Sequence, residues 1–416
     1  SSSAAVKQRM ARIVTRWIVF AVLLLGMNLH AQTGEQKQLE ARKEQLENEI
    51  REINRLLFAE RKQKGSVLDQ MEALNQKINR QQQLIRVTNQ QSNLLNRQIN
   101  ANIRHISKLR EDLKTLKADY ARMIRKSYEN RSQQNRLLFL MSSTSFFQAF
   151  KRLQYMKQYT QFRKQQGEEI VARTEELNTL NADLTRQRKE KELLIAQNRR
   201  VKDQLTQQVA SQQALLKTIR RNESTYTAEI ETKRKEARAI EREIESLIRS
   251  AIAASNRGRG AEASSSSRFA LTPEATLIAN NFSANKGRLI WPVEKGIKKQ
   301  GYGVYADAVY PGIKHQSNGV IIATDQGARA RAVFEGEVIA VLAVPGGNKG
   351  VQVKHGNFIS TYYNLSELYV KKGDKVEAKE ELGEVYTNRS NGLTQLKFYL
   401  YRDATRLNPE EWIYRL

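Results

Sequence analysis

Residues 95–123 read LNRQINANIRHISKLREDLKTLKADYARM and decide most of the fold. Seam positions return there at alternating steps of four and three, and all but the polar Asn102 are apolar: Leu95, Ile99, Asn102, Ile106, Leu109, Leu113, Leu116, Tyr120 and Met123. The same spacing runs without a slip from Leu46 to Met123. It predicts a coiled-coil seam rather than the apolar face of a globular helix. At ~1.5 Å per residue, such a seam spans on the order of 115 Å.

A second apolar pattern runs from Ile170 to Ile252, and all five prolines lie in the last third of the chain. We therefore predict an antiparallel coiled-coil hairpin over residues 35–254, with its turn region at about 131–165. The heptads are interrupted there by NRLLFLMSSTSFFQAFKRLQYMKQYTQF. Its aromatic residues either bury one another as a cap or remain exposed as a docking patch: Phe139, Phe146, Phe147, Phe150 and Tyr155.

The amino-terminal residues 1–31 have the pattern of a signal peptide. A basic start precedes the apolar run Trp17 to Leu25, and cleavage after Ala31 is expected. An uncleaved membrane anchor is the alternative. In both cases the rest of the chain is expected to lie outside the cytoplasm, associated with the inner membrane or the cell wall.

Composition narrows the classes of function. The chain has 416 residues, a net charge of +26, four histidines and no cysteine, which excludes disulfides and thiolate metal sites. The basic charge lies mainly in the first 286 residues, but no nucleic-acid-binding motif accompanies it. Anionic membrane head groups or peptidoglycan are the better partners, and a merely solvated helix surface is the alternative.

The composition changes after the hairpin. Residues 255–286 are predicted to be a flexible linker with a short helix at about 273–282, since Thr272, Pro273 and Glu274 form a helix start. The apolar face of that helix is Leu277, Ile278 and Phe282. After Lys286 the sequence alternates in strand-like segments such as GVIIAT and GEVIAVLAV. The fold class is therefore α+β and multidomain: a coiled-coil hairpin, then a mostly antiparallel β domain at 287–416.

Four segments carry a family resemblance: KGRLIWPVEKG (286–296), SNGVIIATDQGARARAVFEGEVIAV (317–341), KHGNFISTYYNLSELYVKKGDKVEAKEELGEV (354–385) and QLKFYLYRDATRLNPEEWI (395–413). In order and spacing they resemble the lysostaphin/LytM-type peptidase domain, of barrel-sandwich type. Together with the signal, hairpin and linker, the whole chain resembles the murein hydrolase activator EnvC family.

The resemblance implies where a catalytic zinc site would lie. Active members hold zinc with a His-x-x-x-Asp pair and the second His of a His-x-His pair, and use two further histidines. Those five positions fall at Ser317, Ile321, Asn364, Gln395 and Lys397. Because none of them is His or Asp, the resemblance implies no enzyme, no cofactor and no metal. The vacated groove is then a protein-binding surface, or has simply filled in. Its expected residues are Asn318, Tyr363, Asn364, Gln395, Lys397 and Tyr399.

By the same resemblance, the chain is a non-catalytic periplasmic activator of peptidoglycan (N-acetylmuramoyl-L-alanine) amidases in cell division and daughter-cell separation. A division-site ABC transporter is the implied partner of the coiled coil. The short helix at 273–282 is expected either to pack over the groove and regulate it, or to be permanent core. Two other classes remain open: an active zinc-dependent cell-wall endopeptidase, and a periplasmic adaptor or scaffold protein.

Overall fold

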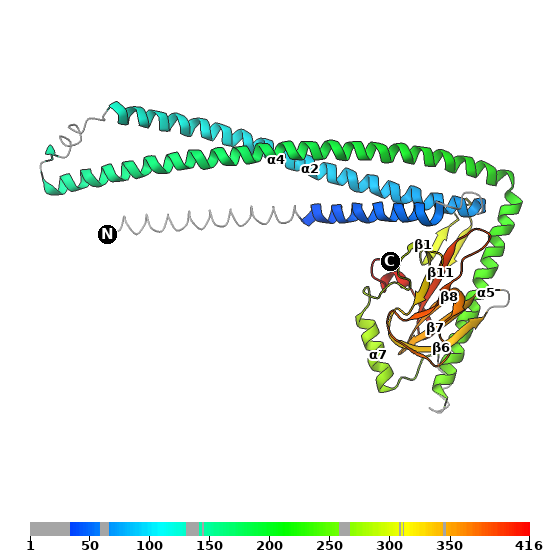
Figure 1. Cartoon of the computed structure of the whole chain (residues 1–416). Helices are drawn as coiled ribbons and strands as arrows, with labels where there is room; N and C mark the ends of the chain where they lie inside the picture. The colour runs from blue at the N-terminus through cyan, green and yellow to red at the C-terminus, as the bar shows by residue number, and fades with distance from the viewer. Residues whose placement is uncertain are drawn as a thin grey trace. The chain divides into compact units, whose positions relative to one another are not determined.

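The computed structural model describes residues 34–58, 66–129, 141–143, 145–257, 267–307, 309–310, 312–343 and 347–416. They form long helices followed by an antiparallel β domain, which confirms the predicted fold class (Figure 1). The chain divides into two units, residues up to 43 with 85–202, and residues 44–84 with 203–416. Within the described residues, no helix combines the length and apolarity needed to cross a membrane. The predicted signal peptide, 1–31, lies outside them.

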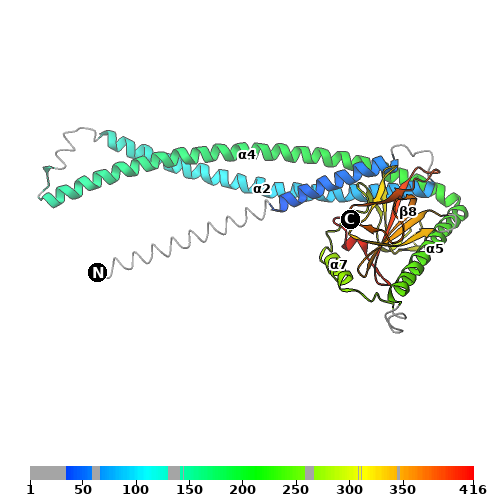
Figure 2. The ribbon, with the colours of Figure 1, turned by 60° about the horizontal axis from the view of Figure 1, so that its bottom comes forward.

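The first unit contains the greater part of two helices, α2 (Val67–Glu129) and α4 (Phe146–Arg221), which run antiparallel (Figures 1 and 2). Asn102 Nδ2 donates to Gln187 Oε1 at 3.0 Å, and nearer the turn Arg173 pairs with Asp112 at 3.6 Å. Residues later in α2 thus contact residues earlier in α4, as in an antiparallel pair. The heptad positions of α2 are buried along this contact, among them Leu95, Ile99, Ile106, Leu109 and Leu113.

The aromatic stretch near the turn does not form a buried cap. Phe146, Phe147, Phe150 and Tyr155 are all exposed, and Phe139 lies outside the described residues. Of the two alternatives that the sequence left open, mutual burial is therefore wrong for these four residues. They lie on the first turns of α4, beyond the point where Gly167 faces Tyr120 of α2.

The second half of the hairpin is not one helix. α4 ends at Arg221, and α5 (Glu223–Asn256) starts after Asn222, whose φ of −122° and ψ of 40° interrupt the helical geometry. We expected the coiled coil to continue to Ala254. Instead α5 lies along the β domain (Figures 1 and 2). A helix over residues 34–53 passes into the π-helical turn η1 (Asn54–Phe58).

The β domain is one large antiparallel sheet with a separate two-stranded ribbon. The strands are β1 (Ile297–Gln300), β2 (Gly303–Ala306), β3 (Lys314–Ser317), β4 (Val320–Thr324), β5 (Arg329–Arg331), β6 (Gly336–Ala343), β7 (Lys349–His355), β8 (Phe358–Leu368), β9 (Lys375–Val376), β10 (Glu381–Val385), β11 (Thr394–Arg402) and β12 (Thr405–Leu407). The main order is β1-β4-β11-β8-β7-β6-β9, and β10 pairs with β5 and β8. β12 pairs with β11, and β2 with β3. A 3-10 turn, η2 (Pro409–Glu411), follows.

Side-chain alternation gives this sheet two apolar faces. On β11, Leu396, Phe398 and Leu400 belong to the main core, whereas Tyr399 and Tyr401 belong to a second cluster with α5. Successive residues of a strand point to opposite faces, so β11 takes part in both clusters. The sheet is thus covered by α5 on one face.

The short helix α7 (Pro273–Ala284) belongs to the main core. Thr272 Oγ1 accepts a hydrogen bond from the Ala275 amide, and Pro273 occupies the first turn. Phe282 is fully buried and stacks on His355 and Phe358, with ring centroids 5.0 and 4.7 Å apart. The hypothesis that this helix packs over the groove is therefore wrong: its Phe282 lies in the main core, and Leu277 is exposed.

His355 makes the core sensitive to acid. It is fully buried, with Nδ1 2.6 Å from the Glu335 carbonyl oxygen and Nε2 2.8 Å from Ser360 Oγ. Burial lowers its pKa from 6.5 to about 4, although the hydrogen bond to the Glu335 carbonyl raises it by a smaller amount. Between these values the unfolded chain binds the extra proton, so the free energy of unfolding falls as the pH drops.

We expect urea unfolding of the β domain to become easier between pH 6.5 and pH 4. His355 should account for up to roughly 3 kcal/mol of that loss. Replacing His355 with Gln should remove this part of the pH dependence, while His105→Gln, on the exposed surface of α2, should leave it unchanged. Equal pH profiles for wild type and His355→Gln would contradict the assignment.

Candidate functional site

The positions that the resemblance assigns to zinc ligands meet on three neighbouring strands. Lys397 of β11 is paired with Ile321 of β4 on one side and with Tyr363 of β8 on the other. Paired residues of antiparallel strands point to the same face. These three side chains, with Thr361, Tyr399 and Tyr401, therefore form the face that α5 covers, here called the covered face.

The remaining expected residues lie around this face. Asn364 has a φ of 81°, and its Nδ2 donates to the Gln395 carbonyl at 2.6 Å. Ser317 ends β3, where its Oγ donates to the Gly319 carbonyl at 2.7 Å. Asn318 follows in the turn before β4 and is buried. The structure thus gathers the strand positions predicted from sequence, while Ser317 and Asn364 are engaged in local hydrogen bonds.

These side chains do not make a zinc-ligand set. Ile321 has no donor atom, Lys397 carries a positive charge, and the Ser317 hydroxyl is committed to a backbone carbonyl. A catalytic zinc needs three protein ligands drawn from imidazole, thiolate and carboxylate. Over the described part of the chain, no group of three or more His, Asp, Glu or Cys residues is arranged to hold a metal. Zinc therefore does not fit the residues present.

Lys397 is a partly buried cation of the covered face. Burial lowers the pKa of its ammonium, and Lys299 acts in the same direction, whereas Glu236 and Glu241 of α5 raise it. Its Nζ lies 5.9 Å from the centre of the Tyr363 ring. Burial raises the pKa of Glu241 too, against the hydrogen bond from Asn318. Both groups are partly buried, and Glu241 is one of the two α5 carboxylates that oppose the lowering of the Lys397 pKa.

α5 binds the covered face through apolar and polar contacts. Its isoleucines at every fourth position pack with the tyrosines of the sheet: Ile240, Ile244, Ile248 and Ile252. Asn318 Nδ2 donates to Glu241 Oε2 at 2.7 Å, and Arg406 Nε donates to Glu245 Oε1 at 2.8 Å. Gln352 Nε2 reaches the Ile244 carbonyl at 3.1 Å.

Sequence reasoning missed α5 as the helix on this face. The signal was present, because Ile240, Ile244, Ile248 and Ile252 are spaced by four throughout, without the alternating three of a heptad seam. The covered face also holds buried polar atoms that lack a hydrogen-bond partner within the described structure: Gln352 Oε1, Thr361 Oγ1 and Gln395 Nε2. Such atoms cost stability and call for a functional explanation.

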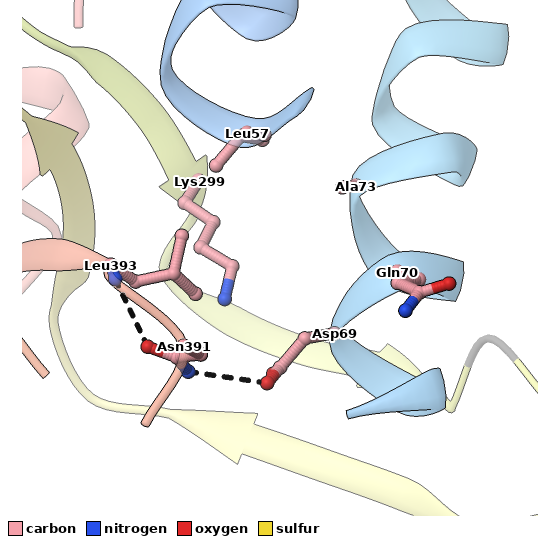
Figure 3. Close-up of a pocket in the computed structure, with 7 residues that line it drawn as sticks. All are labelled: Leu57, Asp69, Gln70, Ala73, Lys299, Asn391 and Leu393. Atoms are coloured by element: carbon pink, nitrogen blue, oxygen red, sulfur yellow. Dashed lines mark hydrogen bonds between the residues drawn. The ribbon is translucent and has the colours of Figure 1, made fainter. Parts of the chain in front are cut away.

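A second contact joins the helices to the β domain, at the pocket in Figure 3. It is lined by Leu57, Asp69, Gln70, Ala73, Lys299, Asn391 and Leu393. Asp69 pairs with Lys233 of α5 at 3.2 Å and accepts from Asn391 Nδ2 at 3.3 Å, and Lys299 pairs with Glu72 at 3.0 Å. Burial raises the pKa of Asp69, but Lys233 and Lys299 outweigh it and hold the pKa below its usual value. We interpret the pocket as a structural contact between the helices and the β domain, since its charged groups already pair with protein partners.

Residues 315–409 match the family model described as Peptidase family M23. We call the carboxy-terminal domain, which contains this match, the M23 domain. Over 449 aligned residues, which cover 99% of both chains, the sequence is 26% identical to the murein hydrolase activator EnvC of Escherichia coli (strain K12).

Several solved structures are similar to part of this chain. A zinc containing peptidase from Vibrio cholerae is 23% identical, with 30% of this chain and 40% of that chain covered and a TM-score of 0.26. Lysostaphin from Staphylococcus simulans is 21% identical, with 30% of this chain and 52% of that chain covered and a TM-score of 0.25. The chain thus spans about half or less of these solved relatives. The assignment to M23 rests on the family model and not on these scores.

The donor chemistry of the M23 domain predicts a protein without bound zinc. We expect the purified full chain to retain no stoichiometric zinc after dialysis, by elemental analysis, and to leave peptide cross-links uncut. Its melting temperature should not change when zinc or a chelator is added, since a ligand that binds only the folded state would raise it. Near-equimolar zinc, removed by chelator together with a lower melting temperature, would contradict this.

Proposed function

We propose that this chain is a non-catalytic, periplasmic activator of peptidoglycan amidases, and that α5 keeps it inactive by covering the M23 face that binds the amidase. Two findings support the activator role: the similarity to EnvC over the whole length, and an M23 domain whose assigned ligand positions hold Ser317, Ile321 and Lys397. The observation that carries the proposal is the packing of α5 on that same face. The domain then works by binding and performs no chemistry itself.

Activation follows from competition for the covered face. An amidase can bind only when α5 has left, so its apparent affinity is reduced by the fraction of chains in the open state. Moving a closed:open ratio from 99:1 to 1:99 takes about 5.5 kcal/mol of differential binding. Burying one isoleucine side chain contributes about 1.5–3 kcal/mol. Four of them would hold α5 firmly, although ordering the helix and its loop offsets part of that gain.

The ends of α5 differ in how they are held. At its carboxyl end, Asn256 is buried, its Nδ2 donates to the Arg268 carbonyl at 2.8 Å, and its Oδ1 accepts from Ala270 N at 2.9 Å. Phe269 packs beside it in the same cluster. At the amino end, one residue, Asn222, separates α5 from α4. We therefore propose that α5 opens from its amino end, when a division-site ABC transporter engages the coiled coil.

Weakening the α5 contact should activate the protein without a trigger. Ile244→Ser combined with Ile248→Ser removes two fully buried side chains, at a cost of at least about 2 kcal/mol each. Amidase activation by the free chain should rise about tenfold or more, because the open fraction grows. The measurement is release of dye-labelled fragments from peptidoglycan by an added amidase, with amide hydrogen exchange of α5 as the direct readout of opening.

Leu277→Ser provides the matched control, since this exposed apolar residue lies on α7 rather than α5. It should leave both readouts unchanged. If the control activates and the α5 variant does not, α7 is the regulatory element instead. Faster exchange in α5 without activation would separate its opening from function and would overturn the proposed role of the covered face.

The opened variant also tests the binding face. Adding Tyr363→Ala or Lys397→Glu to Ile244→Ser/Ile248→Ser should abolish the gained activation, since both residues lie in the centre of the covered face. Val304→Ser, on the exposed β2 ribbon, is the matched change elsewhere on the domain and should retain it. Circular dichroism and thermal unfolding check that each domain remains folded. Full activation by the Tyr363 and Lys397 variants would place the amidase surface elsewhere.

A further inference from the structure

The end of the hairpin carries an aromatic surface that the activator role does not use. Ser145 Oγ accepts from the Gln148 amide at 3.2 Å, so α4 begins at Phe146 and its first turns carry Phe146, Phe147 and Phe150. The exposed fractions of these three rings are 88%, 65% and 55%, and that of Leu153 is 54%. A cluster of exposed apolar side chains marks a surface that binds a protein or a membrane.

These residues follow the geometry of a helix. Phe146, Phe150 and Leu153 are spaced by four and three, so they form one stripe along α4. Lys157 and Lys164 continue that stripe and are exposed, and Lys164 Nζ also lies 3.8 Å from Glu168 Oε1. Lys151 Nζ lies 4.4 Å from the centre of the Phe147 ring, so a cation also accompanies the aromatic side chains. The stripe is apolar at the hairpin end and cationic behind it.

The charge of the segment is entirely of one sign. From Asn130 to Gly167 the sequence has no Asp or Glu, while Lys151, Arg152, Lys157, Arg163 and Lys164 are described basic residues within it. This charge is complementary to an anionic surface. Aromatic side chains insert at the boundary between head groups and acyl chains, and lysines remain among the anionic head groups. A glycan polymer would offer no hydrocarbon region for these phenylalanines.

We propose that the stripe of Phe146, Phe147, Phe150, Leu153, Lys157 and Lys164 docks the hairpin end onto an anionic phospholipid membrane. The aromatic residues enter the interface, and the two lysines lie over the anionic head groups. This surface lies on the first unit, and its membrane binding does not depend on whether the M23 domain activates an amidase.

The absence of cysteine allows a residue-specific test on the full chain. Gln154→Cys, exposed beside the stripe, is labelled with a polarity-sensitive fluorophore, and Thr185→Cys on the same helix serves as the matched control. Vesicles of phosphatidylcholine with phosphatidylglycerol should raise the emission at position 154 and not at 185. Phosphatidylcholine alone should raise neither. Because the label reports on the hairpin end, vesicle binding through any other segment leaves it unchanged.

Two sets of variants in the Gln154→Cys chain assign the contact. Phe146→Ser/Phe147→Ser/Phe150→Ser should weaken the vesicle affinity about tenfold, and so should Lys157→Glu/Lys164→Glu. Arg188→Glu/Lys189→Glu, an exposed pair further along α4, should leave it unchanged. Unchanged emission at position 154, equal affinity of the triple variant, or a signal with isolated peptidoglycan and none with vesicles would each overturn the proposal.

Discussion

Nearby carboxylates stabilise a partly buried ammonium group, and in this protein those carboxylates come from the helix that covers the sheet. Lys397 lies on β11 between Ile321 and Tyr363, on the face that α5 covers. The carboxylates that raise its pKa, Glu236 and Glu241, both come from α5. If the helix leaves, Lys397 meets water, and the covered face presents a cation among tyrosines. Whatever binds there next must supply an equivalent environment, so the position that cannot hold zinc also restricts what can replace α5.

The strength of the α5 contact suits a reversible cover. Its four isoleucines and their sheet partners are buried, which favours the closed state. Against this, Gln352 Oε1 and Thr361 Oγ1 lack partners in the described structure, and burial shifts the pKa values of the partly buried Lys397 and Glu241 toward their neutral forms. A permanent core would replace these groups by apolar side chains, since buried ion pairs seldom gain stability over well-packed hydrocarbon. The polar content is therefore a cost to the closed state, and it is explained if the face has a second occupant.

Much of the fold followed from sequence periodicity, and its failures have physical causes. The heptads of α2 predicted an antiparallel hairpin because their spacing fixes which residues face a partner helix. They could not identify the partner of α5, since isoleucines spaced by four fit a helix and a sheet equally well. The pairing of Ile321, Lys397 and Tyr363 was implied by resemblance, but only the strand register places them side by side. For α7 the capping signal located the helix correctly. Its position depends on Phe282 fitting against His355 and Phe358, a packing detail that no local pattern encodes.

The two ends of α5 are held differently, and this difference has a mechanical consequence. At the amino end, Asn222 is a single non-helical residue between two helices, so a movement of α4 reaches the cover through one short joint. Nearby, Lys233 pairs with Asp69 of α2, which also contacts Asn391 of the M23 domain. In the proposed opening, a pull on α4 would therefore act on Lys233 before it acts on the isoleucines further along α5. At the other end, Asn256 is held by hydrogen bonds to Arg268 and Ala270, on either side of Phe269. A helix anchored at one end and loaded at the other separates turn by turn, so no single step must break all four isoleucine contacts together.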